Sequence, residues 1–223
     1  MDYLVLFILV LISFGLGSRL LSAFCIRQSI SISLEFLTSI ALGFALLGNI
    51  VLLVGIFGFD IKVILYLTVF IGLFSLVIDF SKQSQKCRSA FRSLKEKSLS
   101  RIEWFFILSI VFLLICIVLI GSAPLTGSDA MQYHFYIPKL YAKSELIFPF
   151  FWSVVAFKLG LSHHLILLGM ILNSEKLALL INILGGLLSF LSFFLLSREF
   201  LTRKISMFLV VFFISTPMVY WQI

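Results

Sequence analysis

The sequence has 223 residues, of which 61% are hydrophobic and 12% charged, with a formal charge of +7 and a mean hydropathy of +1.18. Soluble domains carry about 25% charged residues, so this chain has too little polar surface to face water. The composition excludes a disordered chain, and three scattered cysteines exclude a disulfide scaffold. We therefore expect an all-α fold, a polytopic bundle of about six transmembrane helices with short external interfacial helices.

Six apolar runs are long enough to cross a bilayer, which takes about 20 residues at 1.5 Å each. The first run follows Asp2 instead of basic residues and is longer than the apolar core of a signal peptide, so we interpret it as a retained helix. Gly185 and Gly186, inside the fifth run, are expected to allow close helix packing. The six runs are 3–24, 36–57, 61–80, 104–120, 177–196 and 205–220.

Positive charge is concentrated in one loop. From Lys82 to Arg101 the sequence has seven Lys and Arg residues and a single acid, Glu96. Short basic loops stay on the cytoplasmic side of a membrane, so loop 81–103 is expected inside. The N-terminus and residues 122–176 then lie outside. A nucleic-acid partner is not expected, because such an interface would carry aromatic residues between the cations.

This topology divides the chain into three parts. Residues 1–121 form four transmembrane helices, and residues 177–223 form two more and end without a polar tail, as expected of a truncated chain. Residues 122–176 form an external loop that holds all three histidines and three of the four prolines, so a functional site is expected there. Its apolar half, 148–172, is interpreted as interfacial or re-entrant helices, with a hairpin of two spans as the alternative.

Asp129 is the strongest candidate for chemistry in this loop, since it is the only carboxylate between Glu103 and Glu145. Ser128 can cap a short helix there, and the first turn of a helix favours an ionised acid. Tyr133, four residues on, would share the face of Asp129. An ionised acid beside the membrane can act as a base or bind a cation, whereas the simpler interpretation is a helix cap.

The loop also carries cations and imidazoles. Lys139 and Lys143 are four residues apart on a predicted helix, so both can reach an anionic headgroup or a phosphate, although snorkelling to the lipid surface explains them equally well. His163 and His164 are adjacent, about 100° apart on a helix, and cannot both bind one metal without ligands from other segments. One of them can still serve as an acid, a hydrogen-bond donor or a phosphate partner.

Three stretches, PLTGSDAMQYHFYIPKLYAKSE, SHHLILLGMILNSEKLALLINILGG and STPMVYWQI, resemble the N-terminal part of polytopic glycosyltransferases of the C superfamily. The best match is the bacterial family related to protein mannosyltransferases and lipid A aminoarabinose transferases. The resemblance implies an inner-membrane enzyme that transfers a sugar from a polyprenyl-phosphate donor to a glycan, lipid or protein on the external face, usually with inversion. It places Asp129 as the catalytic base or beside it. Candidates for substrate binding are Tyr133, His134, Lys139, Lys143, His163 and His164.

Two departures from this family limit the expectation. Family members are two or more times longer, and a second acid usually follows the span that here ends at Tyr220, so this chain alone is expected to be inactive. The family's first loop commonly carries two adjacent acids, whereas Asp129 stands alone between Ser128 and Ala130. No cofactor is therefore assigned, and a divalent metal stays an open question. The alternative is a non-catalytic membrane protein, either a transport or flippase subunit or a truncated remnant.

Overall fold

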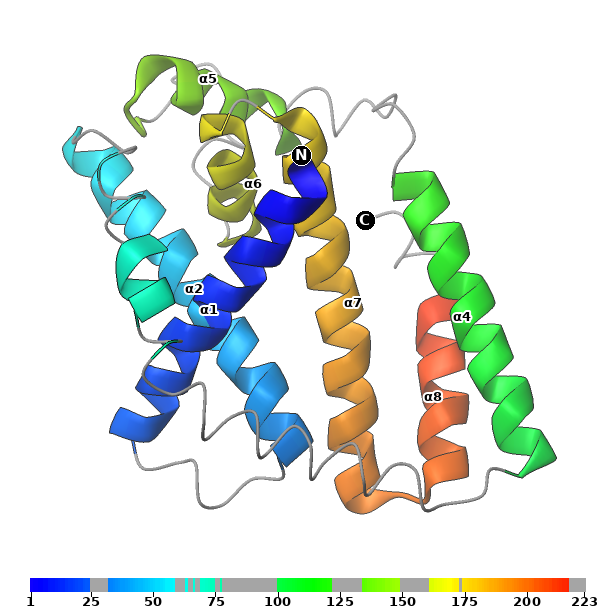
Figure 1. The fold of residues 1–223 in the computed structure, drawn as a ribbon. Helices are drawn as coiled ribbons and strands as arrows, with labels where there is room; N and C mark the ends of the chain where they lie inside the picture. The colour runs from blue at the N-terminus through cyan, green and yellow to red at the C-terminus, as the bar shows by residue number, and fades with distance from the viewer. Residues whose placement is uncertain are drawn as a thin grey trace.

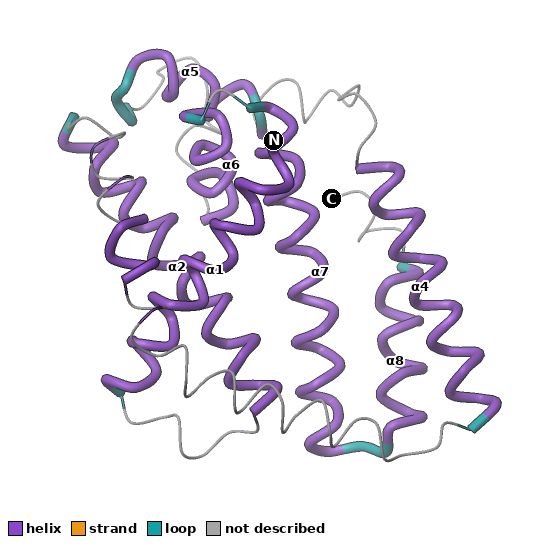
Figure 2. The backbone as a smooth tube through the Cα atoms, viewed as in Figure 1, coloured by secondary structure: helices purple, strands orange, loops and turns teal. Residues whose placement is uncertain are grey.

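In the computed structural model every regular element of the described residues is helical (Figure 2). The described part of the chain contains no strand, which confirms the predicted all-α class. The described residues are 1–24, 32–58, 63, 66, 69–74, 77, 100–121, 134–148, 161–172 and 174–216.

Three of the described helices are long and apolar enough to cross a membrane: α1 (Asp2–Ala23), α2 (Ile32–Phe57) and α7 (Glu175–Phe200). They correspond to the first, second and fifth predicted runs. Many large apolar side chains on these helices are exposed, among them Phe7, Leu53 and Leu191. Long helices with exposed apolar side chains fit a membrane-embedded protein.

Two further helices follow predicted runs. Helix α4 (Arg101–Gly121) covers the fourth run, and α8 (Arg203–Ser215) covers most of the sixth. Residues 217–220 of the sixth run, most of the third run and most of loop 81–103 lie outside the described residues. The described helices therefore test only part of the prediction of six spans.

The helices form a bundle in which α1 crosses α2, α7 stands beside them, and α4 and α8 lie side by side next to α7 (Figure 1). The main core joins α1 and α2 to α6 (Leu161–Ile171) and the first half of α7, and it includes Ile12, Leu47 and Leu168. A smaller core joins α7 to α8 around Phe190 and Ile214. Because lipid is as apolar as these side chains, van der Waals packing holds such helices together.

Small residues bring α1 and α2 together. A Cβ added to Gly17 of α1 would lie 1.8 Å from the carbonyl oxygen of Ser39 in α2, so only glycine fits there. Gly185 is different, since no atom of the described residues lies within 4 Å of the position that a Cβ would take there. The expectation that Gly185 allows close helix packing is therefore wrong as far as the described helices go, because none of them approaches it closely.

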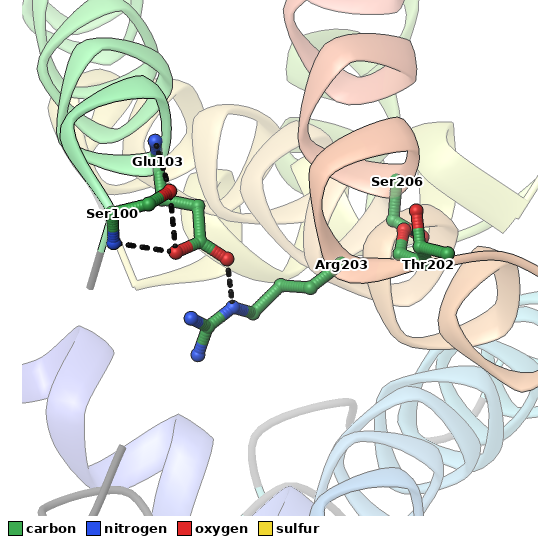
Figure 3. Close-up of polar contacts among 5 residues, drawn as sticks. All are labelled: Ser100, Glu103, Thr202, Arg203 and Ser206. Atoms are coloured by element: carbon green, nitrogen blue, oxygen red, sulfur yellow. Dashed lines mark hydrogen bonds and ion pairs between the residues drawn. The ribbon is translucent and has the colours of Figure 1, made fainter. Parts of the chain in front are cut away.

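An ion pair joins the starts of α4 and α8 (Figure 3). The Arg203 Nε donates to Glu103 Oε1 at 2.5 Å, while the backbone N–H of Ser100 donates to Glu103 Oε2 at 2.8 Å. Ser100 and Glu103 thus form a capping box, which satisfies N–H groups at the start of α4. The hydrogen bond from Arg203, together with those from Ser100, lowers the pKa of Glu103 to about 2. Glu103 is therefore a carboxylate at neutral pH.

Candidate functional site

Helix α5 (Tyr136–Ser144) lies across one end of the bundle, beside the starts of α1 and α7 (Figure 1). We call this end the α5 end. Ile137 and Tyr141 of α5 are buried, whereas Lys139 and Lys143 point to the exposed side, so the helix is amphipathic. Helix α5 therefore presents its cations on the surface of the α5 end.

The segment after α5 is fixed to the end of α2. The backbone N–H of Ile147 donates to the carbonyl oxygen of Gly55 at 2.7 Å, and the Ile147 side chain is buried against that glycine. A Cβ on Gly55 would lie 2.4 Å from Ile147 Cδ1. The loop that carries α5 is thus anchored to a long helix and does not project freely from the bundle.

The start of α7 is tied to the start of α1. Ser174 caps α7 by accepting a hydrogen bond from the N–H of Leu177 at 3.0 Å, and its hydroxyl donates to Asp2 Oδ1 at 3.0 Å. Two residues after Ser174, the Lys176 ammonium lies 4.9 Å from the centre of the Tyr3 ring. These contacts hold the starts of α1 and α7 together at the candidate site.

His134 and His163 meet at the α5 end although 29 residues separate them. The His134 Nδ1 lies 3.1 Å from the His163 Nε2, and the ring centres are 5.1 Å apart. Burial, with smaller contributions from the neighbouring charges of His134 and His164, lowers the pKa of His163 to about 4. His163 is therefore a neutral imidazole at pH 7, able both to donate and to accept a hydrogen bond.

His164 is placed differently from its neighbour. It is only 5% exposed, and its Nε2 has no hydrogen-bond partner among the described residues. Burial lowers the pKa of His164, so this ring is neutral as well. The different surroundings of His163 and His164 follow from the angle of about 100° between consecutive helical side chains.

The two lysines of α5 also differ. Lys139 forms an ion pair with Glu175 in the first turn of α7. Within the described part of the chain, no ion pair is seen for Lys143, whose side chain is exposed. Sequence reasoning missed the contact between Lys139 and Glu175 because 36 residues separate them and no local pattern links them.

Asp129 and Tyr133 lie outside the described residues, so their places in the site stay predictions. Among the residues that are described, no three or more His, Cys, Asp or Glu side chains are grouped closely enough to hold a metal ion. The described part of the site therefore offers neutral imidazoles, the ion pair of Lys139 with Glu175 and the exposed ammonium group of Lys143.

A second feature is an apolar cavity of about 510 Å³ along α7. It is bounded mainly by α2, α7 and single residues of α6 and α8, and its few polar groups are serines of α7. Such a cavity suits a hydrocarbon chain better than a sugar. Residues that line it include Ala41, Phe44, Leu165, Gly185, Ser189, Ser192 and Phe213.

No protein-family model, curated protein or solved structure matches this chain. The candidate site is therefore defined here by its own geometry.

Proposed function

We propose that this chain is the N-terminal portion of a membrane glycosyltransferase that uses a polyprenyl-phosphate-linked sugar. The observation that carries the proposal is that His134 contacts His163 and Lys139 pairs with Glu175 at the α5 end, each pair from segments far apart in the sequence. Asp129 precedes His134 by five residues, which span at most about 18 Å of chain. We therefore propose that the Asp129 carboxylate joins the imidazoles and cations of the α5 end, because transfer from a lipid phosphate requires a base and groups that offset the charge of the phosphate.

We further propose six spans in the bacterial inner membrane, with the α5 end outside and α5 and α6 as interfacial helices. The support is that helix ends predicted to lie on the same side of the membrane lie at the same end of the bundle. The starts of α1 and α7, both predicted outside, lie at the α5 end, and the starts of α4 and α8, both predicted inside, lie at the opposite end (Figure 1). Arg198, Arg203 and Lys204 then face the cytoplasm, as basic residues near spans usually do.

In the proposed reaction Asp129 takes the proton of an acceptor hydroxyl as that oxygen attacks the anomeric carbon. The bond between this carbon and the lipid phosphate breaks on the opposite face, so the configuration inverts. Lys143, which is exposed, offsets the charge of the departing phosphate, and the neutral His163 donates a hydrogen bond to it. The apolar cavity along α7 accommodates part of the polyprenyl chain, and the acceptor is a glycan, lipid or protein.

The experiment is an assay of Asp129→Asn in membranes that contain the product of the complete gene. The readout is transfer of radiolabelled sugar from a polyprenyl-phosphate donor, together with the amount of inserted protein. We expect loss of transfer with normal insertion, because an amide cannot accept the proton. Glu145→Gln, a matched change of an exposed acid of the same loop, is expected to keep activity.

Full transfer by Asp129→Asn would contradict the role of this acid. If neither protein nor variant transfers sugar from any such donor, the non-catalytic alternative, a transport or flippase subunit or a remnant, takes precedence.

A further inference from the structure

The distance between His134 and His163 suits two ligands of one metal ion. Two imidazole nitrogens bound to the same zinc at about 2.0–2.1 Å lie roughly 3.3 Å apart in a tetrahedral site and about 2.9 Å apart at a right angle. The His134 Nδ1 and the His163 Nε2 lie 3.1 Å apart, between these two values. An ion could therefore bind both nitrogens with little movement of either ring.

The two rings are also held in place before any ion arrives. His134 directly precedes Phe135 and is near Ile137, which are 8% and 3% exposed, and His163 directly precedes the buried His164. Packing of α5 against α6 therefore fixes the backbone at both histidines. A preorganised pair loses little entropy when it binds, which raises affinity.

Other ligands of an ion can reach this pair from solvent. His134 is exposed, so water or an oxygen of a bound ligand has access to an ion at this ring. The lysine nearest to His134 in sequence, Lys139, has its charge opposed by Glu175. Among the described residues no group of three potential ligands occurs, so the part of the site that the structure describes supplies two protein ligands.

We propose that His134 and His163 form a two-histidine site for a divalent first-row transition metal such as Zn²⁺. Imidazole is a favourable ligand for zinc, nickel, cobalt and copper, whereas magnesium and calcium prefer oxygen. The site does not depend on the proposed transfer reaction, because metal binding is measured directly. The competing explanation of the short distance is an N–H···N hydrogen bond between the two rings.

The test is a titration of the whole chain, purified in detergent without a histidine tag, with ZnCl₂ by calorimetry and with CoCl₂ by visible absorption. We expect one equivalent to bind, with the absorption bands of nitrogen-ligated cobalt. His134→Ala and His163→Ala should each weaken binding at least about tenfold, since each removes one of two protein ligands. His164→Gln keeps both ligands and is the matched control, with Glu145→Gln as a control outside the core.

His134→Cys separates the two explanations. A thiolate is a good zinc ligand, so this variant should bind Zn²⁺ where His134→Ala does not, whereas an N–H···N contact gives no reason for such a rescue. Gel filtration of each variant checks that it is folded, and the exposed position of His134 makes its substitution safe for the core. Absence of saturable binding, or equal affinity in His134→Ala and the unchanged chain, would overturn the proposal.

Discussion

Gly43 of α2 and Ser13 of α1 touch through their backbones where the two helices cross. A Cβ added at Gly43 would lie 1.8 Å from the carbonyl oxygen of Ser13. Gly17 and Ser39 repeat the relationship with the helices exchanged, so each helix contributes one glycine and one serine, four residues apart. This contact resembles the small-residue motifs that bring transmembrane helices together.

The first prediction follows from this crossing. Gly43→Ala should lower the free energy of unfolding by about 1–3 kcal/mol, because the backbones must separate to admit a methyl group. The measurement is thermal unfolding of the detergent-solubilised chain. Gly185→Ala is the matched control, also in a long helix but with no atom of the described residues within 4 Å of the added Cβ, and it should leave stability unchanged or slightly higher. Equal effects of the two changes would contradict the crossing.

A second prediction concerns the ion pair between Glu103 and Arg203. The folded pKa of Glu103 is about 2, below its ordinary value of 4.5. Its stabilising contribution is therefore complete above pH 4.5 and is lost as the pH falls toward 2. Glu103→Gln should destabilise the chain at pH 7 and remove this part of the acid sensitivity, as measured by unfolding from pH 7 to pH 2. Glu199→Gln, an exposed acid near the same end, should change neither property.

The third prediction is that the pair of Lys139 and Glu175 contributes little to stability. Their side chains are 49% and 58% exposed, so water screens the attraction. Lys139→Gln should cost less than about 1 kcal/mol, and a double-mutant cycle with Glu175→Gln should give a coupling of about 0.2–1 kcal/mol. Lys143→Gln is the control, with an expected coupling near zero. A coupling above about 2 kcal/mol would show that the pair is a structural requirement.

The long helices could be predicted because their signal is local. Apolar runs at 3–24, 36–57 and 177–196 correspond to α1, α2 and α7, and the capping residue Ser174 places the start of α7 two residues before the fifth run. Length and hydropathy are enough for such helices, since a bilayer leaves the backbone few alternatives.

The contacts between segments could not be predicted in this way. Two contacts depend on how α5 packs against α6 and α7, namely that of His134 with His163 and that of Lys139 with Glu175. A single sequence does not reveal that packing. The sequence also does not show which glycines lie at a helix crossing. The adjacent Gly185 and Gly186 are the predicted positions of close packing, whereas Gly43 lies at the crossing. Asp129, the central residue of the proposed site, lies outside the described residues and stays a prediction.

The fourth prediction concerns acid sensitivity at the α5 end. The folded pKa of His163 is about 4, lowered from an ordinary value of 6.5 chiefly by burial. Between these two values the unfolded chain binds a proton that the folded chain does not, so stability falls as the pH falls from 6.5 to 4. The loss from this one group should be at most about 3 kcal/mol.

Two measurements check this loss. Imidazole resonances of the labelled chain should show His163 still neutral at pH 5.5, and His163→Gln should flatten the stability profile between pH 6.5 and pH 4. His134→Gln removes one of the smaller causes of the shift, so it should raise the pKa of His163 while burial keeps that pKa below 6.5. An ordinary titration of His163 near pH 6.5 in the folded chain would mean that the ring is hydrated, and that the packing of α6 against α5 is looser than the structure has it.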